Sequence, residues 1–137
     1  MVHSLRLLWK VWPDMHTWKF ATGGFSGGAK ASFATAAYMV RCELNVIGLF
    51  LTGCNEDRSD GARKHYRAKS SSYRKMRVFL STGDADSYVN EGHLKSVISS
   101  LKSNGLRTLR SERFKGGHMI YKPHIADAVK WFEEEED

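Results

Sequence analysis

A chain of 137 residues that is 42% hydrophobic and holds only two prolines is long and apolar enough to form one packed domain over residues 1–137. This composition excludes a disordered linker. The formal net charge of +6 suggests nucleic acid as a partner, but eight Lys or Arg residues lie in the segment 58–77 alone. No recognised nucleic-acid motif accompanies that segment, so we expect a solvated face and no nucleic-acid partner.

The cysteines and the hydropathy of the chain predict the kind of environment in which the protein resides. Cys42 and Cys54 are too few for a disulfide scaffold and form no C-x-x-C pair, which favours a reduced, cytoplasmic environment and argues against a metal site. No apolar stretch approaches the roughly 18 residues of a membrane span, and the N-terminus lacks a signal pattern. We therefore expect a soluble protein.

The first third of the chain predicts a helix, a strand and a second helix. Leucines at helical spacing mark residues 4–11, and Pro13 brings that helix towards its end. Residues 19–22 are a short strand candidate that runs into a glycine turn at 23–28. The alanine-rich stretch 29–39 then predicts a helix.

Two continuous apolar runs, 46–51 and 78–83, are typical of strands that are buried on both faces. Between them the basic segment 58–77 predicts a loop with a short helix over one edge of the sheet. Residues 91–101 carry apolar side chains at helical spacing, and the Asn-Gly pair at 104–105 predicts where that helix ends.

The last quarter predicts a strand at 107–114, a loop that carries His118, and a closing helix at 123–132. Strand and helix thus alternate four times along the chain. This order predicts an α/β fold, with a parallel sheet of about four strands flanked by helices and joined by right-handed crossovers.

Ser26 lies in the pattern G-x-S-x-G, between a predicted strand and a predicted helix. A serine on such a turn projects its hydroxyl out of the sheet, and we attribute the flanking glycines to the small space around the turn. Two other interpretations fit the same pattern, a plain tight turn and a phosphate site at the helix N-terminus. The phosphate-loop pattern itself is absent, because Lys30 is not followed by Ser or Thr and does not adjoin Gly28.

A hydroxyl nucleophile needs a base, and the base needs an orienting carboxylate. Asp86 follows one predicted strand and His118 follows the next. Ligands gather at the carboxyl ends of strands in α/β sheets, so we expect Ser26, Asp86 and His118 to share one rim. The remaining histidines lack such a pattern and are expected on the surface or in packing roles; they are His3, His16, His65, His93 and His124.

Three stretches of the sequence resemble the α/β-hydrolase family, in particular its esterase, carboxylesterase and lysophospholipase-like members. They are ATGGFSGGA, which resembles the nucleophile turn, VFLSTGDADSYV, which resembles the strand with G-x-x-D, and FKGGHMIY, which resembles the histidine loop. The resemblance extends over nearly all of the chain and corresponds to the C-terminal half of the family's fold.

This resemblance implies Ser26 as the nucleophile, His118 as the general base and then acid, and Asp86 as the carboxylate that holds the imidazole. The backbone N–H of Gly27 is implied as one oxyanion donor. Asp84 is the alternative acid, and Asp86 is preferred because it ends the G-x-x-D pattern. The reaction implied is hydrolysis of a small-molecule ester through an acyl-enzyme, without a cofactor.

Family members have several strands before the nucleophile turn, whereas only one helix precedes it here. The nucleophile strand is therefore expected to expose an edge. We expect an apparently truncated α/β-hydrolase-like domain that forms a homodimer or associates with a missing N-terminal half. The alternative function is a catalytically inactive module that associates through this open edge, and an anion-binding role of the basic segment is a third.

Overall fold

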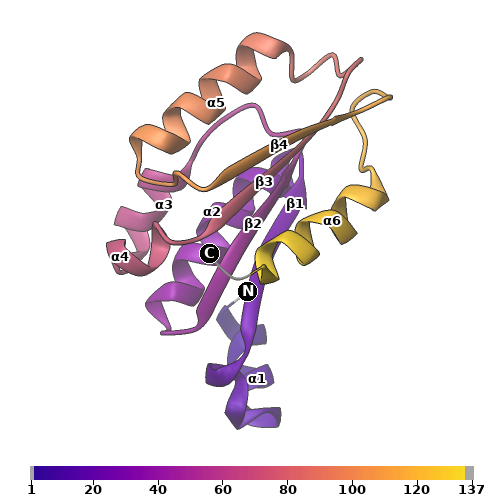
Figure 1. The fold of residues 1–137 in the computed structure, drawn as a ribbon. Coiled ribbons are helices and arrows are strands. Elements are labelled where there is room, and N and C mark those ends of the chain that lie inside the picture. The colour runs from indigo at the N-terminus through magenta and orange to yellow at the C-terminus, as the bar shows by residue number, and fades with distance from the viewer. Residues whose placement is uncertain (1, 135–137) are drawn as a thin grey trace.

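The structure is a computed structural model that describes residues 2–134. In chain order its elements are α1 (Val2–Val11), the 3-10 helix η1 (Pro13–Thr17), β1 (Lys19–Phe25), α2 (Gly27–Arg41), β2 (Asn45–Thr52), α3 (Ser59–Tyr66), α4 (Ser70–Tyr73), β3 (Arg77–Gly83), α5 (Glu91–Ser103), β4 (Leu109–Phe114) and α6 (Lys122–Glu133). Figure 1 shows their arrangement.

The four strands form one sheet in the order β1-β2-β3-β4, and all three neighbouring pairs are parallel. The predicted α/β class and the four-stranded parallel sheet flanked by helices are therefore confirmed. Because consecutive strands are neighbours, right-handed crossovers carry α2, α3, α4 and α5 to one face of the sheet. The last helix, α6, covers the other face over β2 and β3 (Figure 1).

The hydrophobic core has one part on each face of the sheet. The larger part packs α2, α4 and α5 against the sheet and includes Phe33, Tyr73 and Leu101. The smaller part lies under α6 and joins Phe79, Ala128 and Phe132. Along β2, Leu49 and Leu51 belong to the large cluster and Phe50 packs against the small one, as expected where successive side chains point to opposite faces.

The sheet register aligns the carboxyl ends of the strands. Phe25 at the end of β1 pairs with Thr52 at the end of β2, and Thr52 pairs with Ser81 in β3. Gly83 at the end of β3 pairs with Phe114 at the end of β4. The segments that follow the four strands therefore begin at one rim of the sheet.

The structure differs most clearly from the predictions in the glycine segment and in the basic segment. The glycines that were expected to form a turn belong to β1, where Gly23 pairs with Phe50 and Gly24 with Leu51 of β2. Only glycine fits at Gly23, because a Cβ atom there would lie 2.8 Å from the carbonyl oxygen of Phe50. The basic segment forms two short helices, α3 and α4, in place of one.

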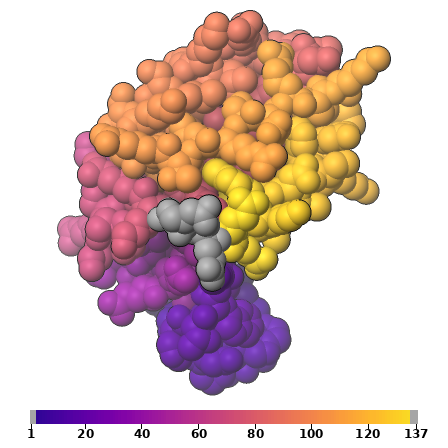
Figure 2. Space-filling model, in the orientation of Figure 1, coloured from indigo at the N-terminus to yellow at the C-terminus, as the bar shows by residue number. Residues whose placement is uncertain are grey.

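The strand β1 lies at an edge of the sheet, as expected from the short sequence before it. At the end of the sheet where β1 begins, α1 and η1 protrude from the body of the molecule (Figure 2). Within residues 2–134, no helix is long and apolar enough to cross a membrane, and no group of His, Cys, Asp or Glu side chains is arranged to hold a metal ion.

Candidate functional site

Ser26 lies between the last residue of β1 and the first residue of α2. Its backbone angles are φ 54° and ψ −114°, a positive φ that is uncommon for a residue with a side chain. Its backbone is held at both ends, because its N–H donates to the Thr52 carbonyl at 2.9 Å and its own carbonyl accepts from Ala29 at 3.1 Å. The side chain makes no helix-capping hydrogen bond, so the hydroxyl is not used to begin α2. Backbone strain of this kind gathers at functional sites.

The two glycines of the G-x-S-x-G pattern have different surroundings. A Cβ atom on Gly24 would lie 2.3 Å from both the carbonyl carbon and the oxygen of Gly28, so the start of α2 packs directly on this glycine. A Cβ atom on Gly28 or on Gly27 would meet no described atom within 4 Å. The explanation of both glycines by lack of space is therefore correct for Gly24 and wrong for Gly28.

Gly27, the predicted oxyanion donor, is the first residue of α2. The first N–H groups of a helix have no acceptor within that helix, and they point out of its N-terminus. Gly27 is exposed and directly follows Ser26. Its N–H is therefore placed to donate a hydrogen bond to an oxyanion that develops on a group bound to Ser26.

Asp86 lies in the turn after β3, and its side chain is 1% exposed. One carboxylate oxygen accepts hydrogen bonds from the backbone N–H groups of Tyr88 at 2.8 Å and Val89 at 3.0 Å. The other oxygen lies 2.9 Å from Nδ1 of His118. Burial by itself would raise the pKa of Asp86, but the hydrogen bonds from His118, Tyr88 and Val89 outweigh it and hold this pKa below its ordinary value. Asp86 is thus an ionised acceptor that orients the imidazole.

The ring of His118 lies between two aromatic side chains, with ring centroids 4.6 Å from Phe25 and 4.7 Å from Tyr88. It also lies over Gly53, where a Cβ atom would be 2.7 Å from the ring carbon Cε1. With Nδ1 donating to Asp86, the second ring nitrogen is left as the acceptor. The histidine therefore sits above the ends of β1 and β2, beside the residue that precedes Ser26.

Among residues 2–134 the side-chain hydrogen bonds join His118 to Asp86, and none of them joins His118 to Ser26. Nucleophile–base contacts in unliganded sites are often long and tighten only when substrate binds. The structure brings Asp86 and His118 into direct contact and places Ser26 at the same rim.

The side chain of Asp84, the alternative acid, contacts the backbone of the histidine loop. Its carboxylate accepts a hydrogen bond from the N–H of Gly116 at 3.0 Å, and its side chain is exposed to solvent. The Ala85 N–H donates to the Gly116 carbonyl at 2.9 Å. Asp84 thus ties the loop after β3 to the loop after β4, whereas Asp86 contacts the imidazole.

Sequence reasoning missed the groups that hold the His118 ring. Gly53 has φ 59°, and both it and Gly83 lie where a Cβ atom would collide with the histidine or its loop. A Cβ atom on Gly83 would lie 2.3 Å from the Gly117 carbonyl oxygen. A glycine directly after or at the end of a predicted buried strand is the signal that could have found both.

The other histidines lie elsewhere. His3, His16 and His65 are exposed, and His93 takes part in the capping box that begins α5. His124 is buried under β3, where Nδ1 lies 2.8 Å from the hydroxyl of Ser81. These positions agree with the surface and packing roles expected from the sequence.

An apolar groove of about 340 Å³ runs along β1 on the face that α6 covers. It extends from the start of the turn, at Gly24 and Phe25, past Ile120 of the histidine loop to Ile125 and Val129 of α6. Thr52 also lines it, and the hydroxyl of Thr52 is buried without a hydrogen-bond partner among the described residues. The other side chains that line the groove are mainly apolar, so most of its surface is hydrocarbon.

Comparison of the sequence with protein-family models and with curated proteins finds no match. The fold is similar to that of acyl-protein thioesterase 2 from Zea mays, with a TM-score of 0.62 and 19% identity over 82% of this chain and 54% of the thioesterase. It is also similar to YahD, solved with malic acid, with a TM-score of 0.55 and 18% identity over 94% of this chain and 57% of YahD.

The chain thus spans little more than half the length of these two structures. At such identities the likeness is one of fold. Both solved proteins are α/β-hydrolases, and the parallel sheet with helices on its two faces is common to all three. This chain therefore shares the fold of the corresponding part of these two structures.

Proposed function

We propose that the protein is a serine hydrolase that cleaves an ester-type bond through an acyl-enzyme intermediate. The observation that carries the proposal is the hydrogen bond of 2.9 Å between Asp86 and His118. It orients an imidazole at the rim where Ser26 has a strained backbone and an unused side chain. A hydroxyl, a carboxylate and an imidazole in this chain order, from Ser26 to Asp86 to His118, match the arrangement used by hydrolases of this fold.

In the proposed reaction the Ser26 hydroxyl oxygen attacks the carbonyl carbon while Nε2 of His118 takes its proton. The oxyanion that forms accepts a hydrogen bond from the Gly27 N–H. Collapse of this intermediate breaks the bond to the alcohol, which leaves with the proton from His118. Water then attacks the acyl-enzyme, again giving its proton to His118, and the acid and the hydroxyl of Ser26 are released.

Asp86 supports each step by fixing the proton on Nδ1 and by stabilising the imidazolium that forms. Its low pKa keeps it ionised throughout the neutral range. The groove along β1 reaches Phe25, the residue before Ser26, and is lined mainly by apolar side chains, which suits an acyl part with hydrocarbon character.

Labelling with a fluorophosphonate probe tests the proposal. Wild-type protein is expected to react stoichiometrically, whereas Ser26→Ala and His118→Ala are expected to lose labelling. Ser96→Ala and His65→Ala are matched controls, because both side chains lie on exposed helix positions, and both variants should label like the wild type. A wild-type chain that is folded by circular dichroism but does not react contradicts the proposal.

A second candidate function, association through the edge of β1, is favoured by the unpaired position of this strand and by the apolar groove beside it. The occupant we propose is a second copy of this chain. Antiparallel pairing of two β1 strands about Thr22 sets Lys19 opposite Phe25, so the only charged residue of the strand does not face its own copy.

Sedimentation velocity over a range of concentrations tests this association. A dimer is expected to form as concentration rises, and Ala21→Glu, on the exposed edge, is expected to abolish it by bringing two carboxylates close together. A mass that stays monomeric at every concentration, or a dimer that persists unchanged in Ala21→Glu, contradicts the β1 pairing.

A further inference from the structure

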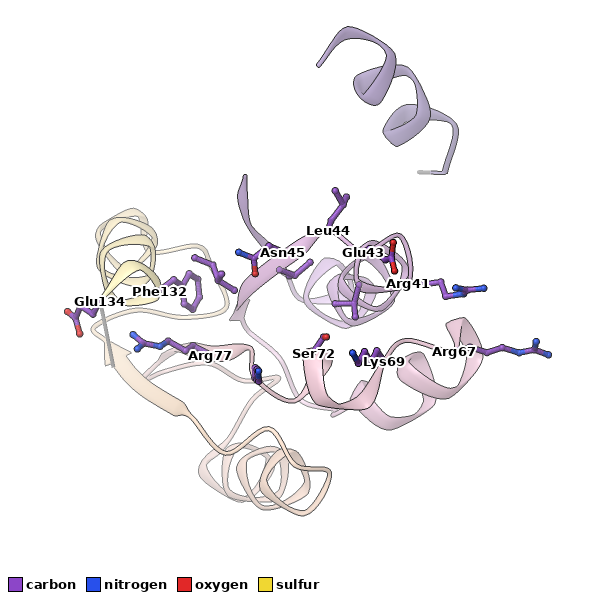
Figure 3. A pocket seen from close by; sticks show the side chains of 14 residues that line it. Arg41, Glu43, Leu44, Asn45, Arg67, Lys69, Ser72, Arg77, Phe132 and Glu134 are labelled. Atoms are coloured by element: carbon purple, nitrogen blue, oxygen red, sulfur yellow. The ribbon is translucent and has the colours of Figure 1, made fainter. Parts of the chain in front are cut away.

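A cavity of about 620 Å³ opens at the end of the sheet where β2 and β3 begin. Its cationic side chains do not converge, because Arg41 and Arg67 extend outward in Figure 3 and Arg77 donates a hydrogen bond to the Trp131 carbonyl. Most of its apolar side chains are buried and leave little surface for a ligand. We assign no ligand to this cavity. The open flank of Ser26, at the other end of the sheet, is a better defined surface.

The free edge of β1 presents backbone groups that can pair with another strand. The backbone groups of successive strand residues point to opposite sides. The Ser26 N–H donates to the Thr52 carbonyl of β2 at 2.9 Å, so every second residue before Ser26 also points its backbone groups to β2. A bulge in the pairing inserts its extra residue, Ile47, into β2, and the alternation along β1 is unbroken. The residues that point to the free edge are therefore Ala21, Gly23 and Phe25.

Antiparallel pairing of two β1 strands about Thr22 uses these outward groups. It sets Ala21 of one copy opposite Gly23 of the other, and both point to the free edge, as a hydrogen-bonded pair requires. Positions that are equally far from Thr22 lie opposite each other. One residue past each end of β1, this register sets Trp18 of the second copy opposite Ser26.

Trp18 is placed to reach Ser26 in this pairing. Its backbone is extended, with φ −80° and ψ 152°, so it continues the line of β1. Its ring centroid lies 6.1 Å from that of Phe20, which packs against the core on the α2 face of the sheet. Trp18 lies on that face too, as expected for side chains two positions apart. Opposite residues of an antiparallel pair share a face, so the indole of the second copy would lie on the side where α2 begins.

The start of α2 has room for this indole. Gly27 is exposed, and a Cβ atom on it would meet no described atom within 4 Å. Trp18 is 38% exposed, and its ring centroid lies 5.9 Å from that of Trp12, which is 46% exposed. Burial of these two large side chains would stabilise the pairing, and tryptophan is enriched at protein interfaces.

We propose that a second copy of this chain completes the hydrolytic site, with its Trp18 packed beside Ser26 and Gly27. Ser26 then lies between His118 of its own chain, which sits over the ends of β1 and β2, and an indole beyond the free edge. The indole forms a wall of the substrate site and keeps water from the open flank of the nucleophile. This consequence for catalysis rests on the proposed hydrolase function, whereas the pairing itself does not.

Disulfide cross-linking tests the pairing without any need for activity. Residues 18 and 26 of one chain lie about 26 Å apart along an extended strand, so no disulfide can join them within that chain. Trp18→Cys/Ser26→Cys is therefore expected to form a covalent dimer on mild oxidation. Each single variant should not, because its two new thiols lie at opposite ends of the paired strands. Cys42→Ser is added throughout, because Cys42 is a partly exposed free thiol.

A second cross-link keeps the test independent of Trp18. Lys19→Cys/Phe25→Cys uses the same register one position further in and leaves the indole in place. It should also form a covalent dimer that neither single variant forms. The pairing is overturned if neither double variant gives more covalent dimer than its single variants. A chain that stays monomeric and sediments with anionic lipid vesicles would also overturn it, because the exposed tryptophans would then contact lipid.

Mixing two variants tests whether the second copy supplies Trp18 to the reaction. Ser26→Ala keeps the indole and lacks the nucleophile, so it should not label with the fluorophosphonate. Trp18→Ala keeps the nucleophile and is expected to label about tenfold more slowly than the wild type, through loss of an aromatic side chain at an interface. The mixture should label faster than Trp18→Ala alone, because a mixed dimer sets Ser26 of one chain opposite Trp18 of the other.

The matched control is a mixture of Trp18→Ala with the double variant Trp18→Ala/Ser26→Ala, which supplies no indole and should restore nothing. Equal labelling in the two mixtures would overturn the role of Trp18 across the dimer. The cross-links are expected even if the wild-type chain does not label. Failure of the pairing and failure of the hydrolase function therefore give different results.

Discussion

The two sides of the candidate site are supported very differently. On one side, the loops after β3 and β4 are tied together by the hydrogen bond from the Gly116 N–H to the Asp84 carboxylate and by the close approach of Gly83 to Gly117. On the other side, Ser26 follows an edge strand that has one neighbour, and Gly27 and Gly28 face open space. The acid and base are thus held by contacts within this chain, whereas the surroundings of the nucleophile are open on one flank.

The largest effect is expected from the acid that orients His118. Asp86→Asn replaces the ionised acceptor and favours the wrong tautomer of the imidazole, so fluorophosphonate labelling should slow by about 10³- to 10⁴-fold. Asp84→Asn is the matched control, because Asp84 contacts the loop backbone and not the ring. Equal slowing in the two variants would contradict the assignment of Asp86. The rate is read from a gel time course.

The next effect concerns the turn at Ser26. Gly24→Ala places a methyl group 2.3 Å from the backbone of Gly28, and this clash should lower the free energy of unfolding by about 1–3 kcal/mol and displace Ser26. Gly28→Ala has open space and should keep stability and labelling. Urea denaturation measures the difference. A Gly24→Ala protein as stable and as reactive as Gly28→Ala would show that the turn is not tightly packed.

A second glycine substitution tests the side of the site that carries Asp86 and His118. Gly83→Ala directs a methyl group at the carbonyl oxygens of Gly116 and Gly117, so it should destabilise the fold by about 1–3 kcal/mol and move His118. Gly61→Ala, on the exposed helix α3, meets nothing within 4 Å and should be neutral or raise stability by up to about 1 kcal/mol. Thermal denaturation of both variants checks this. Similar melting temperatures would contradict the interlocked loops.

The smallest effect is on the pH dependence of stability. The pKa of Asp86 is lower in the folded chain than its ordinary value, so its ionised form stabilises the fold above about pH 4. This contribution is lost as the pH falls through the folded-state pKa. The difference in unfolding free energy between wild type and Asp86→Asn should therefore shrink as the pH is lowered below about 4. A constant difference would contradict the lowered pKa.

Much of the fold follows from local patterns. The runs at 46–51 and 78–83 predict β2 and β3 because buried parallel strands are continuously apolar. The same criterion fails for β1, because Gly23 and Gly24 signal a turn when read alone, and only their pairing with β2 makes them strand residues. Tertiary contacts decide the conformation there.

In the candidate site, too, local patterns predicted some features and tertiary contacts decided others. Asp86 and His118 were expected at one rim because the carboxyl ends of parallel strands meet there, and the structure places them 2.9 Å apart. The aromatic neighbours of the histidine, Phe25 and Tyr88, could not be predicted. They come from segments far apart in the sequence, and ring packing between such segments has no local signature.

Mass-spectrometric mapping of the fluorophosphonate adduct tests the central claim most directly. The chain has 14 serines, and the proposed activation of one of them predicts a single adduct on Ser26. The same digest of the Ser26→Ala protein should contain no adduct. An adduct on another serine, or one spread over several exposed serines, would contradict the assignment of Ser26 as the nucleophile.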